Sequence, residues 1–72
     1  MKLSDIYKTQ PMGTKIQRKF TFEDGSTRVI HRAVILQEKD EHFWMTMIDE
    51  PGQAVQGIPV SNVNKYDNWE VV

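Results

Sequence analysis

Two histidines, His31 and His42, are the first residues to consider for metal binding or acid–base chemistry. In the hairpin register that we predict, their side chains fall on opposite strand faces. The sequence has no H-x-H or HExxH motif, and it has no cysteine that could complete a Cys/His cluster. We therefore expect His31 to be structural and His42 to be solvated in a charged turn, with no bound metal.

The charged run from Glu38 to Glu41 could supply paired carboxylates for hydrolysis. A charged run at a hairpin tip is more often a solubilising turn, and no serine lies in a setting typical of a nucleophile. The glycines are too scattered along the chain to form a phosphate-binding loop. We therefore expect a protein that is not an enzyme and that uses no cofactor.

Four cations near the first predicted hairpin are the strongest candidates for a binding site. Asp24-Gly25 lies between two β-rich runs and indicates a two-residue hairpin loop. That loop would pair Arg18 with His31, and strand alternation would then place all four cations on one exposed face. We expect this face to bind an acidic host protein or nucleic-acid phosphates. Its cations are Lys15, Lys19, Arg28 and Arg32.

The opposite face of the predicted hairpin holds Arg18 and His31 beside the core. A buried cation without a partner is very costly, so this pair needs an acidic acceptor. The available acids are Asp49, Glu50, Asp67 and Glu70, and the sequence does not choose among them. Met45 and Met47 could belong to the core or to an adaptable contact surface. The secondary binding candidates are therefore Arg18, His31, Phe43, Met45 and Met47.

The elements that must position these residues are short strands. Two runs flank Asp24-Gly25, and three more cover residues 43–48, 53–60 and 69–72, all separated by tight polar turns. Ser4 could cap a short N-terminal helical turn. We predict one all-β domain over residues 1–72, either a five-stranded antiparallel bent sheet or an SH3-like barrel. Its core should be formed largely by Ile16, Phe20, Phe22, Val29, Ile35, Trp44, Ile48 and Trp69.

Composition narrows the class of protein. The chain has 72 residues and a net charge of −1, which argues against a general nucleic-acid coat but allows a local basic face. The first residues lack the apolar segment of a signal peptide. No apolar run approaches the roughly 20 residues that span a bilayer. We therefore expect a cytoplasmic protein with no membrane contact.

The two ends of the chain, MKLSDIYKTQPMGTKIQRK and DNWEVV, resemble those of a loose group of small phage and prophage proteins. These proteins begin with a short helix and a basic K-x-x-R-K strand and end in D-x-W-E-[VI]-V. The similarity covers about a third of the chain, and Phe20 stands near the place of the usual Trp. Some members counter the Thoeris defence by sequestering a cyclic nucleotide signal. The resemblance implies a phage origin and a nucleotide ligand, with Lys15, Arg18 and Lys19 at the matching positions.

Three classes of function follow from these observations. We favour a non-enzymatic protein-binding module, such as a phage-encoded inhibitor that docks on a host protein through the basic hairpin face. The first alternative is a nucleic-acid-binding small β-barrel that uses the same face. The second alternative is a protein that sequesters a small nucleotide signal. In each case we expect the protein to act in the cytoplasm, which would be that of the bacterial host if a phage encodes it.

Overall fold

The computed structural model describes the backbone of residues 1–72 and the side chains of residues 1–34 and 39–72. The chain forms one α-helix, five strands and one 3-10 helix. In chain order they are α1 (Leu3–Thr9), β1 (Lys15–Thr21), β2 (Thr27–Lys39), β3 (His42–Thr46), β4 (Val55–Pro59), η1 (Val60–Asn62) and β5 (Trp69–Val71).

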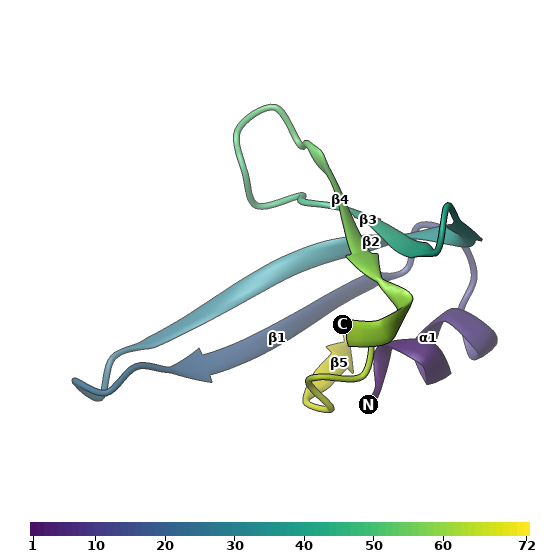
Figure 1. The fold of residues 1–72 in the computed structure, drawn as a ribbon. Coiled ribbons are helices and arrows are strands. Elements are labelled where there is room, and N and C mark those ends of the chain that lie inside the picture. Colours follow the sequence, from purple (N-terminus) through teal and green to yellow (C-terminus); the bar gives the residue numbers. More distant parts are fainter.

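The five strands form a single antiparallel sheet in the order β4-β3-β2-β1-β5. The prediction of a five-stranded antiparallel fold with a short N-terminal helix is therefore confirmed. The order leaves β4 and β5 at the two edges, and Pro59 ends an edge strand, where its missing N–H costs no ladder bond. β1 and β2 form a long hairpin that projects away from the rest of the molecule (Figure 1).

Helix α1 buries its apolar side against the sheet. Leu3 and Ile6, three residues apart, lie on one helix face and are almost fully buried. The predicted cap at Ser4 is wrong, because the helix begins at Leu3 and its N-cap is Lys2, which makes no side-chain bond. The Ser4 hydroxyl instead donates to Asn64 Oδ1 at 3.0 Å. This bond ties the helix to the segment that leads into β5.

The first hairpin has a three-residue loop instead of the predicted two-residue loop. Phe22 N–H donates to the Ser26 carbonyl at 2.8 Å, and Gly25 N–H donates to the Phe22 carbonyl at 3.0 Å. A two-residue type I′ loop needs positive φ at both central residues, but Gly25 alone adopts it here, at 86°. The longer loop shifts the register by one residue, so that Arg18 lies opposite Ile30 instead of His31.

This shift re-sorts the side chains of the hairpin, because neighbouring residues of a strand point to opposite faces. Arg28 and Arg32 share a face with Arg18, whereas Lys15 and Lys19 lie on the other face with His31. The prediction that Lys15, Lys19, Arg28 and Arg32 occupy one face is therefore wrong. The face with the three arginines is the one that helix α1 and the core cover.

The core lies between this sheet face, α1 and the segment before β5. Of the predicted core residues, Ile16 and Trp69 are buried, but Phe22 and Val29 are exposed, at 48% and 38%. Phe20, Trp44 and Ile48 are partly buried, and the Ile35 side chain lies outside the described residues. Among the residues with described side chains, the buried hydrophobic ones are Leu3, Ile6, Ile16, Val34, Met45, Val63 and Trp69.

The second hairpin turns at Asp40 and Glu41, between the paired residues Lys39 and His42. Both turn residues have positive φ, at 54° and 60°, as a type I′ turn requires. The register of β2 against β3 shifts between Ile35 and Glu38, as at a β-bulge. Beyond this shift, Met45 pairs with Val34 on the core face, and Trp44, which we expected in the core, lies on the other face.

Tyr7 fastens α1 to β3. Its hydroxyl donates to the Trp44 carbonyl, and its ring lies 4.7 Å from that of Phe43. Burial raises the pKa of the Tyr7 hydroxyl to about 12.

Among the helices that the structure describes, none has the length and apolar character that crossing a membrane would take.

Candidate functional site

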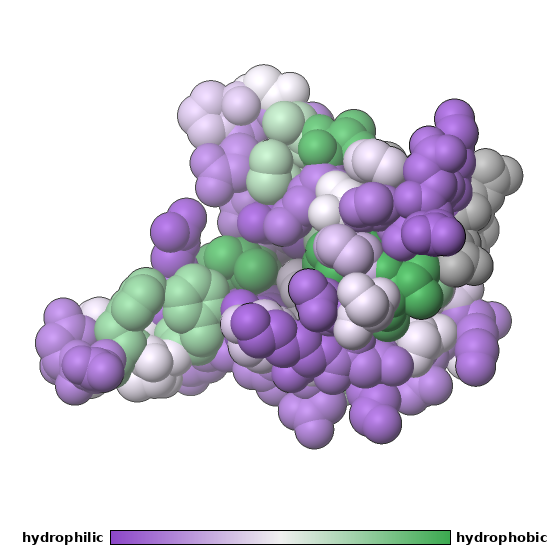
Figure 2. All heavy atoms as spheres, viewed as in Figure 1, coloured by the Kyte–Doolittle hydropathy of each residue, from purple (hydrophilic) through white to green (hydrophobic). Residues whose placement is uncertain are grey.

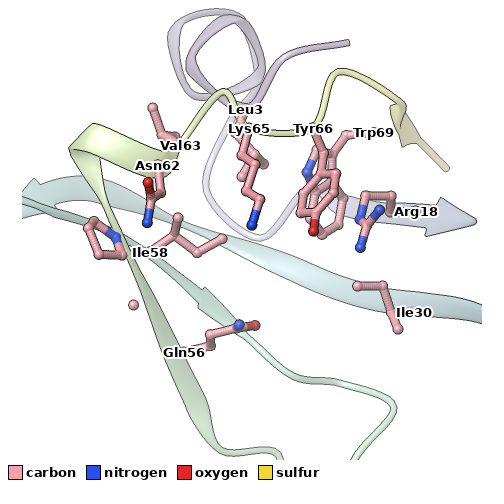
Figure 3. Close-up of a pocket in the computed structure, with 12 residues that line it drawn as sticks. Leu3, Arg18, Ile30, Gln56, Ile58, Asn62, Val63, Lys65, Tyr66 and Trp69 are labelled. Carbon is pink, nitrogen blue, oxygen red and sulfur yellow. The ribbon is translucent and has the colours of Figure 1, made fainter. Parts of the chain in front are cut away.

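A pocket lies between the base of the first hairpin, β4 and the segment between η1 and β5 (Figure 3). Its volume is about 270 Å³. Apolar side chains from α1, β2, β4 and the turn after η1 form part of its lining, and the buried Trp69 lies at one end. These four apolar side chains are Leu3, Ile30, Ile58 and Val63.

Arg18 is the central charged residue of the pocket. It lies on the core-facing side of β1, between Ile30 of β2 and Trp69 of β5. Its guanidinium carbon lies 3.8 Å from the centre of the Tyr66 ring and 5.8 Å from that of Trp69. Both distances are within the range of cation–π attraction. Aromatic rings therefore hold this cation in place at the edge of the core.

None of the carboxylates with described side chains pairs with Arg18, although the sequence led us to expect an acidic partner. The Arg18 Nε is buried and has no hydrogen-bond partner among the described residues. The ion pairs between described side chains belong to two other arginines, Arg28 and Arg32. A buried donor of this kind costs about 1–3 kcal/mol if it stays unsatisfied. The site thus contains a cation whose charge no described carboxylate neutralises.

Lys65 and Tyr66 complete the polar wall of the pocket. Figure 3 shows Lys65, Tyr66 and Arg18 side by side, with their polar ends pointing the same way. Lys65 Nζ lies 5.6 Å from the centre of the Tyr66 ring. The described residues that line the pocket thus include two cations and no carboxylate, although the whole chain carries a charge of −1. The pocket is therefore a local positive site.

Two hydrogen bonds position the segment that carries Lys65 and Tyr66. Asn64 accepts from Ser4 of the helix, and Asn68 Nδ2 donates to the Lys19 carbonyl of β1 at 2.8 Å. The two residues are thus held between anchors on either side. A site built on anchored residues keeps its geometry better than one on an unsupported loop.

Amide groups add neutral hydrogen-bonding capacity to the pocket. Gln56 of β4 and Asn62 of η1 both line it. Gln56 Oε1 accepts from Arg32 Nε at 3.0 Å, so the Gln56 amide nitrogen is the group left to donate to a ligand. Cations, amide donors and aromatic faces beside an apolar floor suit a ligand that combines an anionic group with a planar ring.

Arg32 has a structural role. It is 7% exposed, and its Nη1 donates to Asp49 Oδ1 at 2.7 Å and to the His31 carbonyl at 2.8 Å. Asp49 Oδ2 also accepts from the His31 backbone N–H at 2.9 Å. Burial alone would raise the pKa of Asp49, but this hydrogen bond and the charge of Arg32 outweigh it and lower the pKa. Asp49 is thus the carboxylate that pairs with the buried Arg32.

The remaining sequence candidates are dispersed. Lys15 and Lys19 are exposed on the outer face of β1, and Arg28 forms an exposed ion pair with Glu50 at 3.6 Å. Among the secondary candidates, Met45 is fully buried, which excludes it from a contact surface. Phe43 packs against the core, and Met47 and His31 are partly buried. In the part of the chain with described side chains, no group of acids and histidines is arranged to hold a metal ion.

Sequence reasoning placed Arg18 among the secondary candidates and missed Lys65 and Tyr66. The sequence feature that pointed to this site was Arg18, because a core-facing arginine needs a partner. We looked for that partner among acids, whereas the structure supplies aromatic rings.

Comparisons with known proteins do not place this chain in a family. No family model, curated protein or solved structure matches it significantly. The functional argument therefore depends on the pocket itself.

Proposed function

We propose that this protein is a non-enzymatic binding protein whose pocket takes a small anionic ligand with a planar ring, such as a nucleotide. The observation that carries the proposal is Arg18, stacked 3.8 Å from the Tyr66 ring and without an acidic partner among the described residues. A phosphate would supply the missing acceptor in a charge-assisted bond. A base could stack on the Tyr66 ring, because Tyr66 is 44% exposed.

The resemblance of the chain ends to phage proteins supports the same ligand chemistry, because some of those proteins sequester a cyclic nucleotide. Arg18 is one of the residues at the matching positions. On this proposal the protein would act in the cytoplasm of a bacterial host. A host protein with an acidic surface is the other partner that we considered. The surface that motivated it is divided between two faces of the hairpin, which weakens that alternative.

Calorimetric titration with adenosine monophosphate and thymidine monophosphate tests the proposal. Arg18→Gln should weaken binding at least tenfold, about 1.4 kcal/mol, because hydrogen bonds to charged groups contribute about 1.5–3 kcal/mol. Lys65→Gln should weaken it less, since Lys65 is exposed. Lys19→Gln is the matched control, because Lys19 neighbours Arg18 in the chain but lies on the other sheet face.

Adenosine, which lacks the phosphate, should bind more weakly than adenosine monophosphate. Circular dichroism of each variant verifies that the fold is intact. The proposal fails if neither nucleotide binds the wild-type protein. It also fails if Arg18→Gln and Lys65→Gln bind as tightly as Lys19→Gln.

A further inference from the structure

A row of aromatic rings leads out of the pocket along the projecting hairpin. The Phe20 ring centre lies 5.0 Å from the Arg18 guanidinium, and the Phe22 ring meets Phe20 edge to face at 5.2 Å. Arg18, Phe20 and Phe22 are spaced two residues apart, so they lie on the same side of the hairpin. Figure 2 shows apolar surface along this part of the molecule. The Tyr66 ring, the Arg18 guanidinium and the rings of Phe20 and Phe22 thus follow one another in a row.

Cations lie beside the rings of this row. Arg28 of β2 is directly opposite Phe20 in the ladder and shares its face. Its ion pair with Glu50 has side-chain exposures of 58% and 40%, and pairs this exposed contribute little to stability. A phosphate can therefore compete with Glu50 for Arg28. Arg18 and Lys65 supply two further cations at the pocket end of the row.

We infer that this face binds single-stranded nucleic acid, with one nucleotide in the pocket and the next bases stacked on Phe20 and Phe22. The inference rests on the proposed function, because it extends the ligand outward from the same pocket. Aromatic platforms that alternate with cations are the common device for holding single strands. The three-residue loop of the first hairpin sets a register in which Arg28 lies on the same face as Phe20.

The spacing of the rings favours an extended single strand over a duplex. The ring centres of Phe20 and Phe22 lie 5.2 Å apart, and their planes cross at 76°. Nucleotides within one strand of a duplex advance by only about 3.4 Å. Bases must therefore be spread apart to meet successive rings. A second copy of the chain is a poorer occupant, because a two-fold contact would bring the same cationic surfaces together.

Fluorescence anisotropy with 5′-labelled hexathymidylate, compared with thymidine monophosphate as a competitor, tests the inference. The hexamer should bind at least about tenfold more tightly than the mononucleotide, because each additional stacked base strengthens binding. Phe22→Ala should weaken hexamer binding about five- to tenfold and leave mononucleotide binding unchanged. Val29→Ala is the matched control, since Val29 is also exposed on the hairpin but lies on its other face.

Salt provides an independent measurement. If Arg18, Arg28 and Lys65 each neutralise one phosphate, the logarithm of hexamer affinity should fall with that of salt concentration with a slope of about −2. Mononucleotide binding without any gain for the hexamer would overturn the inference and leave the proposed function standing. Loss of binding to both ligands would instead remove the proposed function. A dimer in analytical ultracentrifugation that Phe22→Ala dissociates would also overturn the inference, because the row would then be a contact between copies.

Discussion

Breaking the Arg32–Asp49 pair should be one of the most destabilising single changes in this domain. Asp49→Ala would leave Arg32 buried at 7% exposure with a charge that its remaining partners, Gln56 Oε1 and the His31 carbonyl, do not neutralise. Removing one partner of a buried pair typically costs about 3–5 kcal/mol. The Asp49 side chain is 21% exposed, so water can partly replace it, and we expect about 3 kcal/mol.

A loss of this size is large for a chain of 72 residues. Domains have a free energy of unfolding of roughly 0.05–0.15 kcal/mol per residue, or about 4–11 kcal/mol here. A domain of this size loses about 4–8 °C in melting temperature per kcal/mol, so we expect a decrease of about 12–24 °C. Urea denaturation followed by tryptophan fluorescence, together with a thermal melt, measures both quantities.

Glu50→Ala is the matched control for this experiment. Glu50 is the next residue in the chain, and its pair with Arg28 is exposed, so its loss should cost under about 1 kcal/mol. Adding Arg32→Met to Asp49→Ala should restore part of the lost stability, because the uncompensated charge is then removed. If Asp49→Ala proved no more destabilising than Glu50→Ala, the structural role assigned to Arg32 would be wrong.

Two further predictions concern acid sensitivity and packing. The lowered pKa of Asp49 stabilises the fold fully above its ordinary value of 3.8, and this contribution is lost as the pH falls through the lowered value. The stability difference between wild type and Asp49→Ala should therefore stay constant from about pH 7 to about pH 5 and shrink below about pH 4, and the absence of any decrease below about pH 4 would contradict this. Gly57→Ala should cost about 1–3 kcal/mol, because the new Cβ would lie 2.8 Å from Trp44 Cζ3. Val55→Ala, at an exposed position of the same strand, should change the urea midpoint little; equal midpoints for the two variants would refute the packing argument.

Local sequence signals were sufficient to predict the class of fold. Alternation of apolar residues and the turn residues between them placed five strands and a short N-terminal helix, all of which the structure contains. Pro59 lies at the end of an edge strand, where a residue without a backbone N–H is tolerated. These features depend on residues within a few positions of each other, so a linear reading can recover them.

The register of the first hairpin could not be predicted from these local signals. Asp24-Gly25 is compatible with a two-residue or a three-residue loop, because Gly25 can adopt positive φ in either. A difference of one residue moves every following side chain to the opposite face. The predicted basic face was lost for this reason, and Met45, which we had considered a contact residue, became part of the core.

The candidate site shows the same limit over a longer distance. Arg18 and Tyr66 are far apart in the chain, and the antiparallel pairing of β1 with β5 brings their segments together. The sequence indicated that a core-facing arginine needs a partner, since burying a charge alone is costly. It could not say that the partner would be an aromatic ring, because that choice depends on how β5 and the turn before it pack. Burial of Trp69 and the anchoring bond of Asn68 bring Tyr66 to Arg18, and both exist only once the sheet has formed.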